Sequence, residues 1–254
     1  MSGHSKWAQI KRQKGAADIK RGQIFTKLAN GIIIAVRQGG GVADPEANFK
    51  LRLAVDRARS FNMPKENIER AISRAKGKSG GVELSEVVYE GFAPGGVAVI
   101  VEAVTDNKQR TAAEIKNTFE KSGGTLGTPG AVSYQFKQEG CITIKKDGKS
   151  LDDILLIAAD AGAEDVEDSD DTACIYTQPQ ELQHVKEELL EKSFAVSDAE
   201  LTRRALNTVP ISDRATAEKT LSFMEKIEEL DDVQKVYSNF DIPDDLLKQI
   251  KTTS

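Results

Sequence analysis

The chain has 254 residues, a net charge of -5 and an ordinary globular composition, with 39% hydrophobic, 30% charged and 6% aromatic residues. This length exceeds the usual size of one domain, so two or three domains are expected. No apolar run approaches the roughly 20 residues that a membrane span needs, and the N-terminus lacks the apolar stretch of a secretory signal. The composition therefore predicts a soluble globular protein without a membrane partner.

Cysteine and histidine are scarce. Cys141 and Cys174 lie far apart in the sequence and form no CxxC pair. So few cysteines in a chain of this length predict a reduced, cytoplasmic setting. The two histidines, His4 and His184, are expected at the surface. Their scarcity argues against a histidine-rich metal site or a catalytic histidine network.

The charge is divided unevenly along the chain. Residues 1–78 hold 17 basic and 6 acidic side chains, whereas residues 79–254 hold 18 basic and 34 acidic ones. A basic part of this kind is typical of a segment that meets a polyanion, while the acidic part keeps the rest soluble. The alternative is that the two parts simply attract each other.

The basic N-terminal part has the periodicity of three amphipathic helices. Apolar residues recur at helical spacing from Ile24 to the glycines at 39–41, where the first helix is expected to end. Asp44 as N-cap and Pro45 at the first helical position predict a second helix, and a third follows Pro64. The expected buried stripes are Phe25, Leu28, Ile32, Ala35 and Val36; Leu51, Ala54, Val55, Ala58 and Phe61; and Ile68, Ala71, Ile72 and Ala75.

After a linker at residues 76–81 the period changes to that of strands. Ser150, with Asp153 three residues later, has the pattern of a capping box at a helix start. The expected elements are, in chain order, a hairpin of strands 86–92 and 97–104, a helix at 110–124, a second hairpin at 131–144, a helix from 150 to 161, a strand at 172–177, a helix after Pro179, a strand at 199–209, a helix around Leu221 and a strand at 233–240.

These elements predict an α+β fold with three domains. Residues 1–78 form a helical bundle, and two α+β domains of ferredoxin-like type follow. Residues 134–210 hold a complete split sheet with two helices, whereas residues 81–133 lack one helix. Residues 211–241 hold a helix and a strand without a sheet. We therefore expect 211–241 to complete the domain of 81–133, with 134–210 inserted between them.

The strongest functional signal is the basic arm, residues 2–27, which holds seven Lys or Arg and a single carboxylate, Asp18. Basic side chains opposite an apolar stripe can bind phosphates while the helix stays docked, with release of counterions. Trp7 either stacks on an unpaired base or anchors the arm to the bundle. The second and third helices add Arg52, Arg57, Arg59, Arg70, Arg74 and Lys76, each of which has a solvated helix face as its alternative.

No motif for catalysis is present. The chain has neither a GxxxxGK[ST] loop nor a GxGxxG fingerprint after a strand, so we expect no catalytic residue, cofactor or bound metal. The acidic run at 164–171 lacks the glycine and terminal Glu of an EF-hand loop and predicts a solvated turn. Residues 105–111 lie at a strand-to-helix junction, where a helix N-terminus can receive an anion. The alternative there is plain capping by Asp106 or Asn107.

Four segments together resemble the YebC/PmpR family: GHSKWAQIKRQKGAADIKRGQIFTKL, MPKENIERAI, YEGFAPGGVAVIVEAVTDNKQRTAAEI and GTLGTPGAVSYQF. The resemblance implies a three-domain, non-enzymatic protein. Bacterial members are described as DNA-binding transcriptional regulators. Others, including a mitochondrial relative that activates translation of a cytochrome oxidase subunit, are linked to ribosomes and to translation through proline-rich stretches.

The resemblance thus implies two polyanionic partners, duplex DNA and ribosomal RNA. We expect contact with either at Lys6, Trp7, Lys11, Arg12, Lys14, Lys20, Arg21 and Lys27. Nothing in the sequence identifies a recognition helix or a dimer matched to a palindromic site, which favours RNA or the ribosome on physical grounds. The acidic α+β domains would position a protein partner. An enzyme acting at a cleft between these domains is the alternative from another class.

Overall fold

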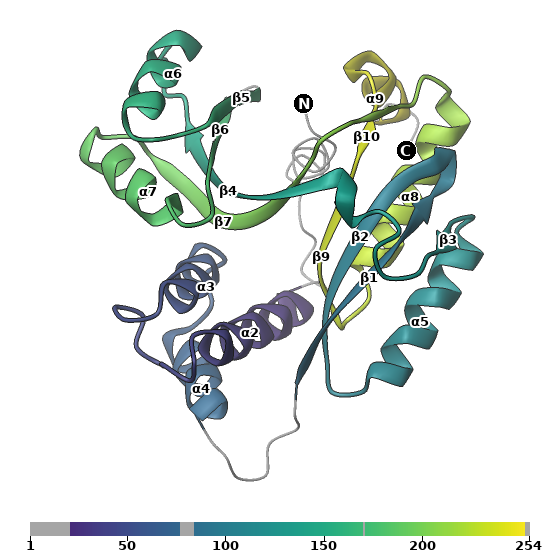
Figure 1. Ribbon diagram of the computed structural model, residues 1–254, viewed down its shortest axis with the longest axis horizontal. Coiled ribbons are helices and arrows are strands. Elements are labelled where there is room, and N and C mark those ends of the chain that lie inside the picture. Colours follow the sequence, from purple (N-terminus) through teal and green to yellow (C-terminus); the bar gives the residue numbers. More distant parts are fainter. Residues whose placement is uncertain (1–20, 77–83, 170, 252–254) are drawn as a thin grey trace. The chain divides into compact units, whose positions relative to one another are not determined.

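The computed structural model describes residues 21–76, 84–169 and 171–251. Helices combine with two four-stranded sheets, so the expected α+β class is confirmed (Figure 1). The chain divides into two compact units, one with the described residues of 24–80 and 138–203, the other with those of 2–23, 81–137 and 204–254. The three domain boundaries drawn from the sequence stay a prediction.

The N-terminal region forms the three expected helices, α2 (Arg21–Gln38), α3 (Phe49–Ser60) and α4 (Lys65–Lys76). Most of the predicted apolar stripes are buried between them, and Ile32, Val36, Leu51, Ala58 and Ala71 are at most 2% exposed. Phe61 was expected in the core but is 45% exposed, because α3 ends at Ser60 and the chain turns before the ring reaches the bundle.

The start of α3 differs from the sequence prediction. Asp44 accepts the backbone N–H of Glu46 and closes a separate turn, so it does not cap the helix. Asn48 is the N-cap and accepts the N–H of Leu51 at 3.1 Å. Its side-chain amide also donates to the carbonyls of Ala35 and Val42. A single buried asparagine thereby starts α3 and ties it to the end of α2.

The first sheet has the order β3-β1-β2-β9, with β1 (Ser85–Ala93), β2 (Val97–Thr105), β3 (Thr125–Leu126) and β9 (Val233–Ser238). The expected hairpin is confirmed by antiparallel pairing of β1 with β2. The C-terminal strand also lies where the sequence places it, because Val99 pairs with Ser238. Helices α5 (Lys108–Lys121) and α8 (Arg214–Glu228) pack on this sheet. β8 (Val209–Pro210), β10 (Phe240–Asp241) and α9 (Asp244–Lys251) complete the unit.

The second sheet has the order β5-β6-β4-β7, with β4 (Phe136–Lys145), β5 (Asp165–Ser169), β6 (Thr172–Thr177) and β7 (Val196–Ala205). Helices α6 (Leu151–Asp160) and α7 (Leu182–Glu191) cover its apolar face. The predicted capping box is confirmed, since Ser150 accepts the N–H of Asp153 at 3.1 Å. Ile142, Ile154 and Val185 are fully buried in the resulting core.

Two local predictions in this sheet are wrong. Residues 131–144 form a short 3-10 turn (Ser133–Gln135) and then one long strand, β4, instead of a hairpin. Gly140 marks a close approach rather than a turn, because a Cβ there would lie 2.9 Å from the Cβ of Leu182. The acidic run is also not a solvated turn. Its residues 165–169 form the edge strand β5, where Asp165 and Asp168 are exposed.

The prediction of two separate, reduced cysteines is wrong as well. Cys141 on β4 and Cys174 on β6 are joined by a disulfide, with a Cα–Cα distance of 6.0 Å. The 33 residues between them conceal this proximity, because Cys141 pairs with Tyr176 in the antiparallel register and Cys174 lies diagonally across from it. Only the strand pairing brings the two residues together.

Candidate nucleic-acid interface

The structure describes two of the eight residues expected to contact nucleic acid. Arg21 is the first residue of α2, and Lys27 lies further along the same helix with a half-buried side chain. The other six lie outside the described residues: Lys6, Trp7, Lys11, Arg12, Lys14 and Lys20. Contact through the basic arm therefore stays a prediction.

Arg57 on α3 is engaged inside the protein. Its guanidinium is ion-paired and hydrogen-bonded to the carboxylate of Glu200 on β7. The two side chains are 32% and 21% exposed, so this pair is partly shielded from water. A charge-assisted hydrogen bond in such a place stabilises more than an exposed ion pair does. Arg57 therefore holds α3 against the second sheet and presents no free cation to a polyanion.

Arg52 is engaged in a similar way. It donates to the backbone carbonyl of Pro45 at 3.0 Å and lies 3.6 Å from the carboxylate of Glu187 on α7. From the same helix, Asp56 accepts a 2.9 Å hydrogen bond from Lys186 of α7. Charges of both signs on α3 thus meet opposite charges on the acidic domain. For these residues the attraction between the basic and acidic parts of the chain is the correct interpretation.

The exposed cations of the described N-terminal region lie mainly on α4. Arg70, Arg74 and Lys76 are exposed and form no ion pair with a described residue. Arg70 and Arg74 are four residues apart and therefore lie on one face of the helix. Arg59 on α3 is 71% exposed and lies 3.6 Å from Asp56. A basic surface on α4 is thus available to a phosphate backbone.

We expect alanine substitution to separate these two kinds of arginine. Arg57→Ala should lower the free energy of unfolding by about 1–3 kcal/mol, because Glu200 loses a charged partner in a partly shielded site. Arg74→Ala should change it by less than about 0.5 kcal/mol, since the side chain is exposed and unpaired. Urea unfolding of the two variants and of a Glu200→Ala/Arg57→Ala cycle measures both effects. Equal losses for Arg57→Ala and Arg74→Ala would contradict this assignment.

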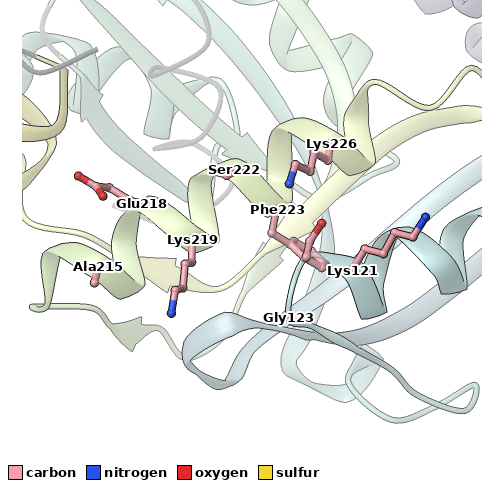
Figure 2. A pocket seen from close by; sticks show the side chains of 9 residues that line it. Lys121, Gly123, Ala215, Glu218, Lys219, Ser222, Phe223 and Lys226 are labelled. Carbon is pink, nitrogen blue, oxygen red and sulfur yellow. The ribbon is translucent and has the colours of Figure 1, made fainter.

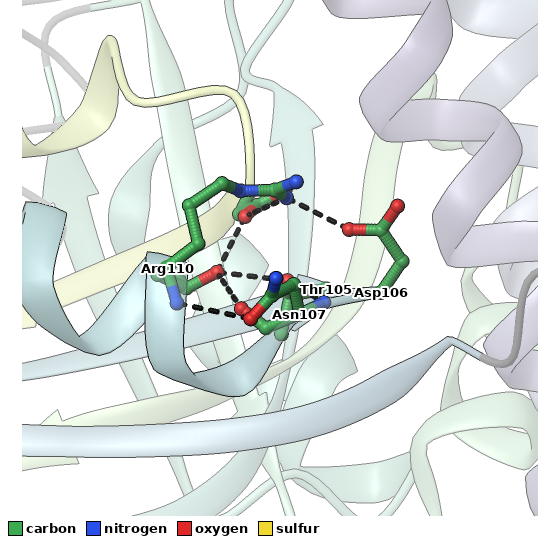
Figure 3. Close-up of polar contacts among 6 residues, drawn as sticks. Thr105, Asp106, Asn107 and Arg110 are labelled. Atoms are coloured by element: carbon green, nitrogen blue, oxygen red, sulfur yellow. Dashed lines mark hydrogen bonds and ion pairs between the residues drawn. The ribbon is translucent and has the colours of Figure 1, made fainter.

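The junction at residues 105–111 is capped rather than open to an anion (Figure 3). Asn107 is the N-cap of α5 and accepts the backbone N–H of Arg110 at 3.1 Å. The guanidinium of Arg110 donates to Asp106 and to Asp232, each at 2.8 Å. The capping alternative is therefore confirmed for Asn107. The guanidinium of Arg110 is paired with carboxylates of the chain itself.

Asp232 completes this network from the loop before β9. Its carboxylate lies 2.5 Å from the hydroxyl of Thr111, which in turn lies 2.8 Å from that of Thr105. Burial raises the pKa of Asp232, but the hydrogen bonds from Thr111 and Arg110 outweigh it, so the pKa lies below its ordinary value. The network fixes the strand-to-helix junction and leaves no anion site there.

Within the described residues, no group of three or more His, Cys, Asp or Glu side chains is placed to hold a metal ion. No helix of the described part is long and apolar enough to cross a membrane. His184 is exposed on α7, as expected, whereas His4 lies outside the described residues.

These features define a class of protein: a basic N-terminal helical region followed by two further domains of mixed helix and sheet. The model of the TACO1/YebC protein N-terminal domain matches residues 5–78, and that of the TACO1/YebC second and third domain matches residues 84–240. The chain therefore belongs to the TACO1/YebC family, as the resemblance in the sequence indicates.

Known proteins are similar over nearly the whole chain. A protein of Dictyoglomus turgidum named "Probable transcriptional regulatory protein" is 52% identical over 98% of this chain and 100% of its own length. A Thermotoga maritima protein of the same name is 50% identical, over 98% of each chain. The crystal structure of a conserved hypothetical protein from Aquifex aeolicus has a TM-score of 0.82 at 46% identity, over 89% of this chain and 92% of that one.

Proposed function

We propose that this protein is a non-enzymatic regulator of gene expression that binds nucleic acid through its N-terminal domain, residues 1–78. The observation that carries the proposal is the charge of that domain, 17 basic against 6 acidic side chains in a chain that is acidic elsewhere. Lys and Arg in such excess attract a phosphate backbone and release its counterions. The names of the relatives in Dictyoglomus and Thermotoga support a role in transcription, and duplex DNA is the partner that we propose for that role.

Ribosomal RNA is the second candidate partner, and the ion pairs formed by the arginines of α3 favour it. Sequence-specific reading of duplex DNA needs several side chains of one element at the base edges of a groove. Arg52 and Arg57 of α3 are held by acidic residues, which leaves α3 poorly suited to serve as a recognition helix. The exposed cations of α4 suit phosphate contacts that carry no sequence information. A ribosome-bound protein that aids translation fits such contacts.

Co-sedimentation with purified ribosomes at low and high salt, with free duplex DNA as competitor, tests the proposal. The control is a variant with Lys11, Arg12 and Lys14 changed to Glu. Salt-sensitive ribosome binding that DNA does not displace and that the variant loses supports a translation factor. Binding to DNA alone, lost in the same variant, supports transcription. If neither polyanion is bound in a manner that depends on these residues, the proposal is wrong.

An enzyme at a cleft between the α+β domains is the alternative from another class. Removal of residues 2–14 distinguishes the two. A regulator that binds phosphates through its arm loses its effect in a regulatory assay, whereas an enzyme whose chemistry lies in the α+β domains keeps it. Full activity of the truncated chain would contradict the role of the arm.

A further inference from the structure

A shallow hollow of about 540 Å³ lies between the end of α5 and one face of α8 (Figure 2). Lys121 comes from the last turn of α5, and Lys219 and Lys226 come from α8. Together with Ala215 and Ser222, the α8 residues recur at spacings of three and four, so they form one face of the helix. Three lysines therefore line one hollow.

This local charge contrasts with the domain around it. Residues 81–137 and 204–254 together hold 12 basic and 17 acidic side chains, yet the hollow has three lysines and one carboxylate, Glu218. That carboxylate hydrogen-bonds to Arg214 at 2.7 Å and points away from Phe223 in Figure 2. Within the described residues the three lysines form no ion pair, unlike Lys116 on the same α5, which lies 3.9 Å from Glu120. Lys219 interacts electrostatically with the carboxylate of Asp213, so the neighbouring carboxylates offset the positive charge of the hollow only in part.

Capping of α5 does not account for the lysines. The last carbonyls of α5 accept hydrogen bonds from the backbone N–H groups of Ser122, Gly123 and Gly124, so its C-terminus is already satisfied. The hydroxyl of Ser122, which lines the hollow, is buried and has no hydrogen-bond partner among the described groups. The lysines of the hollow are therefore not needed as caps of α5.

The floor of the hollow is closely packed. Phe223 is fully buried and meets Phe119 of α5 edge to face, with ring centroids 4.8 Å apart. A Cβ at Gly124 would lie 2.6 Å from the ring of Phe223, so the chain after α5 can approach α8 only as glycine. The two helices are therefore closely packed where they line the hollow.

We propose that this hollow binds successive phosphate groups of a nucleic-acid strand, as a second contact that rests on the proposed function. Lys219 and Lys226 are seven residues apart, which spreads their backbone positions over roughly 10 Å of helix. That spread suits an extended polyanion better than one small anion. Lysine binds phosphate as a point charge without demanding a fixed geometry, which is appropriate to an open hollow on the surface.

Lysine acetylation footprinting of the full chain, with and without a 12-nucleotide oligouridine, tests this proposal. Lys121, Lys219 and Lys226 are expected to be protected, whereas Lys108, an exposed lysine at the other end of α5, is not. If the arm lysines are protected and the lysines of the hollow are not, this inference is wrong and the proposed function still stands. If neither the arm lysines nor the lysines of the hollow are protected, both the inference and the proposed function are wrong for this oligonucleotide. Equal protection by inorganic phosphate alone would show a small-anion site and overturn the inference as well.

A matched pair of variants gives a second measurement. Changing Lys121, Lys219 and Lys226 to Gln should reduce the slope of log affinity against log salt by about 2, at roughly 0.7 for each phosphate contact with a single strand. Changing Lys108, Lys116 and Lys248 to Gln removes the same charge from the same unit and should leave the slope nearly unchanged. Equal slopes for the two triple variants would overturn the inference, even while the unaltered chain binds the oligouridine.

Discussion

Glu90→Gln is expected to lower the free energy of unfolding by about 2–3 kcal/mol at neutral pH, the range for hydrogen bonds to a charged group. Glu90 on β1 is 7% exposed. One of its oxygens accepts the backbone N–H of Gly130 at 2.9 Å, and the other accepts those of Val132 and Ser133, both at 2.8 Å. A glutamine places an NH₂ group against at least one of these donors and removes the charge.

Urea unfolding of Glu90→Gln beside Glu114→Gln measures this effect. Glu114 is exposed on α5, so its substitution should change the free energy of unfolding by less than about 0.5 kcal/mol. The comparison separates the loss of a buried carboxylate from the loss of one negative charge. Indistinguishable midpoints for the two variants would show that the loop at 127–135 does not depend on Glu90.

The same carboxylate predicts how stability depends on pH. Burial raises the pKa of Glu90, but the hydrogen bonds from Val132, Gly130 and Ser133 outweigh it, so the folded pKa lies below the ordinary value. A depressed folded pKa contributes stability that is fully present above the unfolded pKa, about 4.3, and is lost as the pH falls through the folded pKa. The difference between the parent chain and Glu90→Gln should therefore be constant near neutrality and shrink below about pH 4.

The pKa of Asp232 is also depressed in the folded state. Asp232 therefore contributes stability that is lost in acid, as Glu90 does. The Glu90→Gln variant should consequently still lose stability in acid, though over a smaller total change than the parent chain. A variant that carries Asp232→Asn in addition should lose less still. If the acid dependence of the parent chain and of Glu90→Gln were identical, Glu90 would not have the depressed pKa that its hydrogen bonds imply.

Periodicity predicts the elements of this protein better than it predicts their ends. The first hairpin and helices α4 to α8 follow from apolar spacing and capping residues, because these signals are local. The hairpin expected at 131–144 is wrong, because Gly140 serves close packing against Leu182 of α7, which is 42 residues away. Such a contact leaves no signal within a local window.

The pairing of charged side chains also depends on contacts between residues that are distant in the sequence. Composition alone predicts that the N-terminal domain is basic, yet it does not distinguish Arg57, which is paired with Glu200, from Arg74, which is not. The carboxylate of Glu90 meets the loop at 127–135 only because β1 and that loop are neighbours in space. The hollow between α5 and α8 likewise joins lysines about 100 residues apart. A sequence pattern reports which residues are available, and the fold decides which of them stay free.

The basic arm carries the prediction with the largest effect on function. Changing Lys11, Arg12 and Lys14 to Glu should weaken binding to duplex DNA or ribosomal RNA by roughly a hundredfold or more at moderate salt, because three phosphate contacts become repulsive. The slope of log affinity against log salt should fall by nearly 3 on duplex DNA, at about 0.9 for each contact. Fluorescence anisotropy with labelled duplex DNA and a ribosomal RNA fragment, each over a range of salt, measures both quantities.

The matched control changes Lys108, Lys116 and Lys248 to Glu, which alters the net charge by the same amount outside the N-terminal domain. If binding followed net charge alone, both variants would weaken it equally, since every surface charge would contribute to one long-range field. If the arm makes phosphate contacts, only its variant changes the slope, because counterions are released only where cations meet phosphates. Equal slopes would therefore contradict contact through the arm and leave α4, with Arg70, Arg74 and Lys76, as the surface to test next.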